Sequence, residues 1–244
     1  GQFARMEEQE ASMSSNTDLL DRILTFDDET QRGLTAFTRE WYAQEDGILA
    51  QVRRRTRDLG LPEIQIRPEE GQILYFLARM IGARNVLEVG TLAGYSTIWL
   101  ARALPDDGTV VTLEVDPAHA RVAREHFALA GLNGRIEIVE GSAHETLPML
   151  ARREPFDMMF IDADKTGYPA YLAWALENLP DGALIVAHNA FRQGKLISDE
   201  PDEAALATRE LLKAMARDER LLSTIIPVGD GLAVGMIQRG VGTP

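Results

Sequence analysis

The sequence predicts an α/β fold in which a mostly parallel sheet carries helices on both faces. After Glu70, short β-like runs alternate with segments of helical periodicity. The runs are almost continuously apolar, which is typical of strands that are buried on both faces. The last two runs are joined by GDG, a hairpin signal, so we expect the sheet to end with an antiparallel strand.

The elements of this domain follow from the apolar runs and from the segments between them. A first helix, within GQILYFLARMIG, is expected to end at Gly82. The predicted strands cover residues 85–90, 109–115, 135–140, 157–162, 183–188, 222–228 and 232–238. The predicted helices among them cover residues 95–103, 118–131, 143–151, 168–179 and 203–218. We find neither an internal repeat nor a linker, so residues 70–244 are predicted to form one domain.

The upstream part of the chain has a different pattern. Residues 1–16 are polar and poor in large apolar side chains, so we expect a disordered tail, part of it derived from the expression vector. Residues 17–69 are predicted to form a helical extension that acts as a lid or as a dimer contact. Its apolar residues recur at helical spacing, in one stripe near Leu19 and another near Leu49.

The composition excludes some classes of function. The formal net charge of −13 would repel the phosphates of a nucleic acid or of a membrane surface, and it favours a small-molecule partner. No apolar run approaches the ~20 residues that span a bilayer, and no signal peptide is recognisable. Cysteine is absent, which excludes disulfides and thiolate chemistry. We therefore expect a cytoplasmic protein.

The segment LEVGTLAGYS, at the end of the first strand, predicts a ligand-binding turn. Ligands of open parallel sheets lie beyond the carboxyl ends of the strands. Gly90 and Gly94 let the backbone turn tightly, and Ser96 opens the next helix, where free N–H groups favour polar groups. The glycine spacing is not G-x-G-x-x-G and no P-loop lysine follows, which disfavours a nicotinamide dehydrogenase.

Two acidic residues indicate what this turn binds. Glu114 ends the second strand, where a carboxylate suits the two hydroxyls of a ribose. Glu88 lies inside the first strand, where a buried carboxylate costs several kcal/mol unless it is paired or meets a cationic ligand. An ion pair with a lysine or arginine would satisfy Glu88. S-adenosylmethionine, which combines an ammonium, a sulfonium and an adenosine, would satisfy both acids, and we favour it.

Four motifs resemble those of the cation-dependent O-methyltransferases, the group similar to caffeoyl-CoA and catechol O-methyltransferases. They read LEVGTLAGYSTIWLARAL, TLEVDP, FDMMFIDADKTGYPAYL and PVGDGLAVGM, and they occur in the family's order between Leu61 and Met236. The resemblance implies a Rossmann-like class I methyltransferase fold, with seven strands and an antiparallel last strand. It also implies a homodimer, because family members are commonly dimers.

The resemblance further implies which residues bind the cofactor. Glu88, Gly90, Thr91 and Ser96 would line its methionine and ribose side, and Glu114 would hold the ribose hydroxyls. The remaining residues would contribute as follows: Ile66 a backbone contact, Ala143 and His144 positions beside the adenine, and Asp164 a further contact.

The predicted metal site departs from the family pattern. In the family, the metal ligands are the first aspartate of IDADK and an Asp-Asn pair after the fifth strand. Here the first ligand would be Asp162, but the pair reads His188-Asn189. A phenol ionises at a pKa of about 10, so a metal that chelates two adjacent hydroxyls would activate it. Lys165 would be the general base or the charge stabiliser.

Three interpretations of His188 remain open. We favour an altered metal site that binds Mn²⁺, Fe²⁺, Co²⁺, Ni²⁺ or Zn²⁺ rather than Mg²⁺ or Ca²⁺, because the hard ions prefer oxygen ligands. In the second interpretation no metal binds and His188 is the general base. In the third, the chain binds S-adenosylmethionine without catalysis and His188 makes local hydrogen bonds.

The loop after His188-Asn189 corresponds to the family's substrate-contact loop. Phe191 would cover an aromatic ring, Arg192 would meet an acidic group, and Gln193 would lie beside them. The expected substrate is a catechol-like or other phenolic small molecule, although these loop residues would also be compatible with an ordinary surface.

Overall fold

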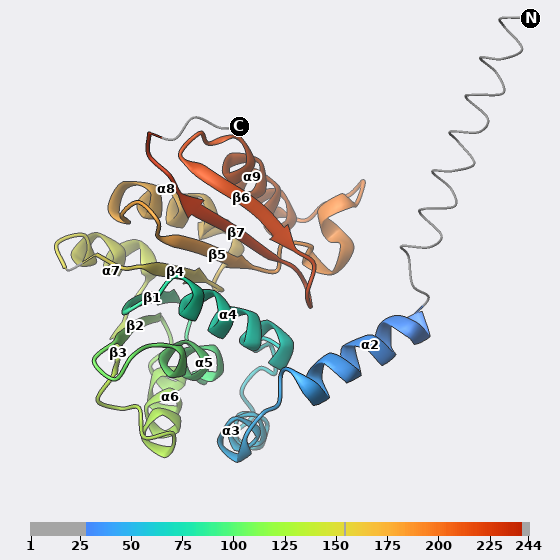
Figure 1. Ribbon diagram of the computed structural model, residues 1–244, viewed down its shortest axis with the longest axis vertical. Coiled ribbons are helices and arrows are strands. Elements are labelled where there is room, and N and C mark those ends of the chain that lie inside the picture. Colours follow the sequence, from blue (N-terminus) through green and yellow to red (C-terminus); the bar gives the residue numbers. More distant parts are fainter. Residues whose placement is uncertain (1–27, 154, 241–244) are drawn as a thin grey trace, which may run out of the picture. The chain divides into compact units, whose positions relative to one another are not determined.

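The computed structural model describes residues 28–153 and 155–240 (Figure 1). The chain divides into two compact units, with the division between Gln44 and Glu45. The first unit contains α2 (Asp28–Trp41), which has Asp28 and Glu29 in its first turn, where carboxylates stabilise the helix dipole. No side chain of α2 is buried. The predicted tail and the Leu19 stripe lie outside the described residues, and the predicted lid or dimer role stays a prediction.

The second unit is built on a seven-stranded sheet of order β3-β2-β1-β4-β5-β7-β6. Pairing is parallel from β3 to β5, whereas β7 runs antiparallel to both β5 and β6. The strands are β1 (Asn85–Val89), β2 (Thr109–Glu114), β3 (Ile136–Glu140), β4 (Met158–Ile161), β5 (Leu184–His188), β6 (Leu221–Ile226) and β7 (Leu232–Ile237). The predicted fold class, including the antiparallel last strand, is confirmed.

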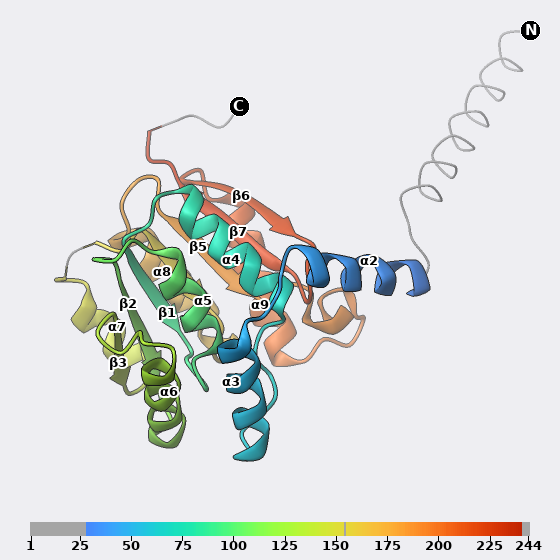
Figure 2. The same ribbon diagram turned by 60° about the horizontal axis from the view of Figure 1, so that its bottom comes forward.

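Helices cover both faces of the sheet, as Figures 1 and 2 show. One apolar core joins the sheet to α3 (Gly47–Asp58), α4 (Pro68–Met80), α5 (Tyr95–Ala103) and α6 (Pro117–Leu129). The other joins it to α7 (Ala143–Leu150), α8 (Tyr168–Asn178) and α9 (Glu203–Arg217). The short 3-10 turns are η1 (Lys165–Gly167) and η2 (Arg192–Ile197). Because successive side chains of a strand point to opposite faces, Val186 and His188 of β5 face the α4 side, and Ala187 faces the other.

The compact unit begins upstream of the predicted boundary at residue 70. Helix α3 starts at the N-cap Asp46, whose Oδ1 accepts a hydrogen bond of 2.9 Å from the Leu49 backbone N–H. Leu49 and Val52 are fully buried in the same core as Leu100 of α5. This burial ties α3 to the sheet domain, so the unit runs from Glu45.

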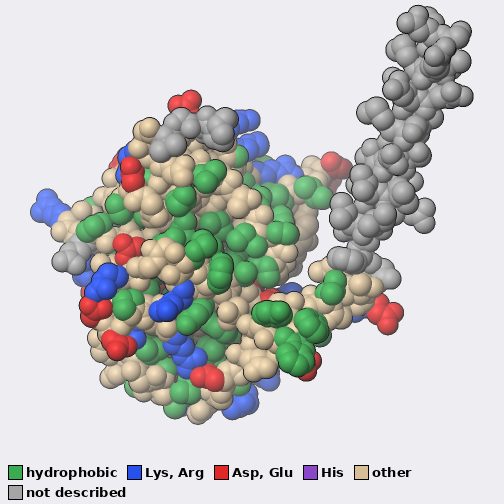
Figure 3. Space-filling model, in the orientation of Figure 1, with side chains coloured by type: hydrophobic (Ala, Val, Ile, Leu, Met, Phe, Trp, Pro, Cys, Tyr) green, Lys and Arg blue, Asp and Glu red, His purple; other side chains and the backbone are tan. Residues whose placement is uncertain are grey.

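The order of the strands determines where a ligand can bind. From β1 the chain continues outward through β2 and β3, and it then returns to β4 on the other side of β1. This reversal opens a crevice beyond the carboxyl ends of β1 and β4. Elsewhere, apolar side chains gather over α4 and β6 on the surface seen in Figure 3. The exposed apolar side chains of these two elements include Phe76, Met80 and Leu222. None of the helices in the described part of the chain is long and apolar enough to cross a membrane.

Candidate active site

Two adjoining cavities, of about 800 and about 570 Å³, form one cleft at the reversal point. They share lining residues from the β1 and β4 carboxyl ends, including Gly90, Leu92, Asp162 and Asp164. The larger cavity is also lined by Ile66, Thr91, Ser96, Lys165, His188, Asn189, Arg192 and Gln193. The smaller one is also lined by Glu114, Ala143 and His144. The structure thus brings most of the predicted site residues to one cleft.

Gly90 is required by the close packing of the two central strands. Its φ is +98°, and a Cβ built on it would lie 2.2 Å from the carbonyl oxygen of Asp162. A side chain at this position would therefore push β1 and β4 apart where the cleft begins. Gly94 has the same constraint, because a Cβ there would lie 2.3 Å from the ring of Phe127.

Glu114 organises the turn that follows β1. Its Oε2 accepts hydrogen bonds from the backbone N–H groups of Thr91 (3.2 Å) and Leu92 (2.7 Å), and its Oε1 accepts one from Asp116 (2.9 Å). The carboxylate is almost fully buried, yet it lines the smaller cavity beside Ala143. Its position is the one predicted for a group that binds ribose hydroxyls.

Asp164 and His144 are tied to α8 through Tyr171. The Tyr171 hydroxyl donates to Asp164 Oδ1 over 2.6 Å, and the His144 ring lies 5.3 Å from the Tyr171 ring, centroid to centroid. Asp164 Oδ2 also caps the η1 turn by accepting from the Gly167 N–H at 2.9 Å. These contacts hold the wall between the two cavities in place.

Glu88 lies beneath the cleft and does not line it. Hydroxyl groups satisfy both of its oxygens: Ser96 Oγ donates to Oε1 (2.6 Å), and Thr112 Oγ1 (2.7 Å) and Thr97 Oγ1 donate to Oε2. Burial raises the pKa of Glu88 to about 7, although the three hydroxyl donors partly oppose that increase. The buried carboxylate of Glu88 is therefore satisfied by hydroxyl groups, and not by the lysine or arginine that the sequence also allowed.

The raised pKa of Glu88 makes folding stability depend on pH. The folded pKa of about 7 exceeds the reference value of 4.5, so the unfolded chain loses this proton first as pH rises. We expect the free energy of unfolding of the wild type, relative to Glu88→Gln, to fall between about pH 4.5 and about pH 7 and to level off above. Urea unfolding of both proteins across this range measures the difference. A difference that does not vary with pH would contradict the prediction.

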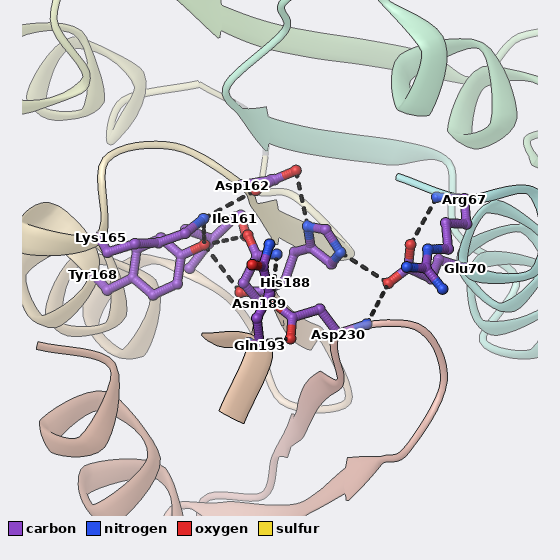
Figure 4. A network of polar contacts seen from close by, with 10 residues as sticks. All are labelled: Arg67, Glu70, Ile161, Asp162, Lys165, Tyr168, His188, Asn189, Gln193 and Asp230. Carbon is purple, nitrogen blue, oxygen red and sulfur yellow. Dashed lines mark hydrogen bonds and ion pairs between the residues drawn. The ribbon is translucent and has the colours of Figure 1, made fainter. Parts of the chain in front are cut away.

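A buried histidine that lines the larger cavity lies between two carboxylates (Figure 4). His188 Nε2 lies 2.9 Å from Glu70 Oε1, and His188 Nδ1 lies 3.0 Å from Asp162 Oδ2. The first contact is a hydrogen bond, whereas the second is an ion-pair contact poorly aligned for one. The exposed fractions of the side chains are 5% for His188, 2% for Glu70 and 21% for Asp162.

The three groups shift one another's pKa values. Burial alone would lower the pKa of His188, but Asp162 and then Glu70 raise it to about 9. Burial would raise the pKa of Asp162, but His188 and then Lys165 hold it at about 2. Burial would likewise raise the pKa of Glu70, yet its contacts with His188 keep it below the usual value. At neutral pH the set is therefore an imidazolium between two carboxylates.

Lys165 brings a second positive charge to Asp162. Its Nζ donates to Asp162 Oδ1 over 3.0 Å and to the Tyr168 hydroxyl over 2.6 Å. Burial, and then the charge of Asp162, raise the pKa of Tyr168 well above its usual value, so this hydroxyl stays protonated. It lies within 3.2 Å of the carbonyl oxygens of Ile161 and His188, which anchors the lysine to the ends of β4 and β5.

The loop after β5 is held by Asp230. The Asn189 side-chain amide donates to Asp230 Oδ2 (2.9 Å), and the Gln193 backbone N–H donates to Oδ1 (2.6 Å). Asn189, Arg192 and Gln193 all have φ values between 51° and 58°, in the left-handed region. Of the three predicted substrate residues, Arg192 and Gln193 line the cleft. Phe191 does not, since its ring packs against the backbone at Gly231.

The predicted metal ligands do not fit a divalent ion in this arrangement. Both oxygens of Asp162 contact cationic groups, those of Lys165 and His188. Both ring nitrogens of His188 face carboxylates, so neither presents a lone pair. Within residues 28–153 and 155–240, no three His, Cys, Asp or Glu side chains are placed to hold a metal ion. The same protonation leaves His188 without the free nitrogen that a general base needs.

Glu70 is a residue of this site that the sequence did not reveal. It occupies position N3 of α4, and its Oε2 accepts a hydrogen bond of 2.7 Å from the Arg67 backbone N–H, as in a capping box. Pro68 and the acidic residues of the first turn are ordinary features of a helix N-terminus, so the local sequence indicates a helix start and nothing more. Nothing in the local pattern relates Glu70 to His188, which follows 118 residues later.

Comparison with protein families gives a match over most of the chain. The family model described as O-methyltransferase matches residues 39–237. A catechol O-methyltransferase of Niastella koreensis is 41% identical over 202 residues, which are 80% of this chain and 91% of that protein. A catechol O-methyltransferase of Mycobacterium tuberculosis is 42% identical over 208 residues, or 83% of this chain and 94% of that protein.

Several solved structures with the same fold carry a bound ligand. An O-methyltransferase from Bacillus cereus in complex with SAH has a TM-score of 0.80 and 36% identity, covering 84% of this chain and 97% of that one. An O-methyltransferase from Streptomyces achromogenes in complex with SAM has a TM-score of 0.80 and 33% identity, covering 88% of this chain and all of that one, at 100%.

Proposed function

Because this chain belongs to the O-methyltransferase family, we propose that it transfers the methyl group of S-adenosylmethionine to a hydroxyl of a catechol-like or other phenolic small molecule. The observation that carries the proposal is the single cleft, which joins the Glu114 cavity to the cavity of Lys165 and His188. One end suits a nucleoside, and the other gathers charged groups around an acceptor. The names of the two catechol O-methyltransferases support the substrate class.

The residues of the cleft fit S-adenosylmethionine. Glu114 would bind the ribose hydroxyls, and the Ser142–Ala143 segment and His144 would border the adenine. Gly90 and Thr91 would lie along the methionine end, where the absence of a Cβ at Gly90 leaves the backbone accessible. When bound, S-adenosylmethionine supplies an electrophilic methyl group on a sulfonium. The residues of the larger cavity would then orient the acceptor oxygen in line with that methyl group.

The acceptor end of the cleft offers two cations to a phenol. The Lys165 ammonium and the His188 imidazolium flank Asp162, and Arg192 lines the opening. Positive charge beside an acceptor hydroxyl stabilises the phenolate that attacks the methyl group. The predicted divalent metal would supply the same stabilisation, and His188 as a base would supply a proton acceptor instead. The contacts of His188 favour the charge-based route over both.

Two measurements test the proposed function. Calorimetry is expected to show binding of S-adenosylmethionine and no binding of NAD, since a nicotinamide dehydrogenase is the competing enzyme class. A radiolabelled methyl group is then expected to appear on at least one member of a catechol and phenol panel. Binding of NAD without S-adenosylmethionine would reject the assignment. Binding of S-adenosylmethionine without turnover, with and without added metals, would favour a non-catalytic binding protein.

Glu114→Gln is expected to weaken S-adenosylmethionine binding about 10- to 100-fold, because hydrogen bonds to a charged group contribute about 1.5–3 kcal/mol. The change removes the carboxylate that holds both the Thr91–Leu92 turn and, in the proposal, the ribose. Calorimetric titration measures the dissociation constant. The matched control is Glu140→Gln, at the register partner of Glu114 on β3, where an unchanged constant is expected. An unchanged constant for Glu114→Gln would contradict the ribose role.

A further inference from the structure

His188 occupies the position where the family pattern has an aspartate, and its buried contact with Glu70 indicates a role for it. We propose that the imidazolium of His188, held between Glu70 and Asp162, takes the place of the divalent cation, so that methyl transfer by this protein needs no metal ion. The inference rests on the proposed function, since it states where the positive charge for that reaction comes from.

The first argument is the number of acceptors around the ring. A neutral imidazole has one N–H donor and one lone pair. Here carboxylate oxygens of Glu70 and Asp162 lie within 3.0 Å of both nitrogens, and neither carboxylate can donate while ionised. A lone pair on either nitrogen would lie close to an ionised oxygen, so the arrangement favours a proton on each nitrogen. A ring in this state contributes a positive charge and no metal-binding lone pair.

The second argument is that the other predicted ligands already have protein partners. Asp162 contacts His188 through Oδ2 and Lys165 through Oδ1. The side-chain amide of Asn189 donates to Asp230. A divalent ion at Asp162 would have to displace Lys165 and His188 from its two oxygens, whereas the hydrogen bond of the Asn189 amide N–H does not involve the carbonyl oxygen of that side chain.

The third argument is that Glu70 is fixed and cannot turn away from His188. Its Oε2 accepts from the Arg67 backbone N–H (2.7 Å), and its Oε1 accepts from the Asp230 backbone N–H (3.1 Å). Gly229 packs so closely on it that a Cβ there would lie 2.0 Å from Oε1. An aspartate at position 188 would face this fixed carboxylate, so Glu70 and His188 form a matched pair. Glu70 is a positioning residue, because it acts through His188.

The chemistry balances without a metal. The acceptor oxygen forms a bond to the methyl carbon while the carbon–sulfur bond breaks, and the electron pair of that bond stays on sulfur. The hydroxyl proton passes to bulk water through the open cleft. The products are the methyl ether, S-adenosylhomocysteine and one proton. His188 keeps both of its protons throughout and stabilises the negative charge that develops on the acceptor oxygen.

The decisive experiment combines a rate with a direct measurement of metal binding. Wild-type protein, treated with chelator, is assayed for methyl transfer on the catechol panel with and without added Mg²⁺ or Mn²⁺. Binding of Mn²⁺ is followed separately by electron paramagnetic resonance and by calorimetry, in the presence of S-adenosylhomocysteine. We expect the same rate with and without chelator, and no Mn²⁺ binding to the wild type.

Two variants make the test specific. His188→Gln removes the cation, and we expect its kcat to fall about 10²-fold, with no rescue by Mn²⁺ and with S-adenosylhomocysteine binding retained. The double variant His188→Asp/Glu70→Gln restores the family pair without the opposing carboxylate, and we expect it to bind Mn²⁺. Arg153→Gln, which removes a positive charge from the ion pair with Glu137, is the matched control and should behave like the wild type.

The outcomes separate the two proposals. Loss of wild-type activity in chelator with rescue by Mn²⁺, or Mn²⁺ binding that His188→Gln abolishes, would overturn the role of His188 and leave the methyltransferase assignment intact. If the wild type methylates no acceptor under any condition, the proposed substrate class fails. The Mn²⁺ measurements still decide then whether His188 replaces the metal.

Discussion

Glu70→Leu is expected to lower the free energy of unfolding by about 3–5 kcal/mol, the usual cost of removing one partner of a buried ion pair. The change leaves the imidazolium of His188 buried with one carboxylate instead of two. It also deprives the backbone N–H groups of Arg67 and Asp230 of their acceptors. The first loss leaves a buried cation with one partner fewer, and the second removes acceptors from two partly buried N–H groups, so the two costs act in the same direction.

Urea unfolding, followed by circular dichroism, measures this effect. The matched control is Glu210→Leu on α9, where the carboxylate is exposed and pairs with Lys213. We expect that control to change stability by no more than about 0.5 kcal/mol, as is usual for surface substitutions. A Glu70→Leu protein as stable as the control would mean that Glu70 and His188 do not form the ion pair.

Lys165→Met is expected to lower kcat for methyl transfer about 10²- to 10³-fold, with binding of S-adenosylmethionine retained. The ammonium lies in the larger cavity, 3.0 Å from Asp162 and 2.6 Å from the Tyr168 hydroxyl, and it lies 4.6 Å from the centre of the Tyr168 ring. These contacts fix its position, so Lys165→Met removes a positive charge that is held in one place. Methionine keeps an unbranched apolar side chain as far as the ε position and removes the ammonium group with its charge and donors.

Steady-state kinetics on the best acceptor of the panel, with calorimetry for the cofactor, measures both parts of this prediction. Lys165→Arg keeps the charge and is expected to retain more activity than Lys165→Met. Lys213→Met, in an exposed pair on α9, serves as the control and should leave kcat unchanged. If Lys165→Met alters KM alone, Lys165 contributes to binding of the acceptor and not to stabilisation of the reacting oxygen.

The fold could be predicted from the sequence because its pattern is local and periodic. The predicted strand at 157–162 appears as Met158–Ile161, and the predicted helix at 143–151 appears as Ala143–Leu150. Small differences occur at the ends of elements, where capping and fraying decide the boundary. The extension was harder to delimit, because burial of Leu49 and Val52 against α5 is a tertiary contact that periodicity does not report.

The site could be predicted in part. Gly90 and Glu114 were recognisable because each follows or ends a strand, and the carboxyl ends of parallel strands meet at one edge. Asp162 and Lys165 were recognisable through the resemblance to the family's IDADK motif. Glu88 was recognisable as unusual, but its three hydroxyl partners come from α5 and β2. The hydrogen-bond partners of a buried group depend on which elements pack against it.

By itself, the sequence determined the layered sheet, the ligand-binding edge and the presence of a histidine where the family pattern has an aspartate. Tertiary structure alone decided which groups that histidine contacts. Packing of α4 on the sheet brings Glu70 within 2.9 Å of His188, while β4 brings Asp162 to the other nitrogen. The charge of an imidazole depends on the groups within a few ångströms of its two nitrogens, and these groups lie far apart along the chain.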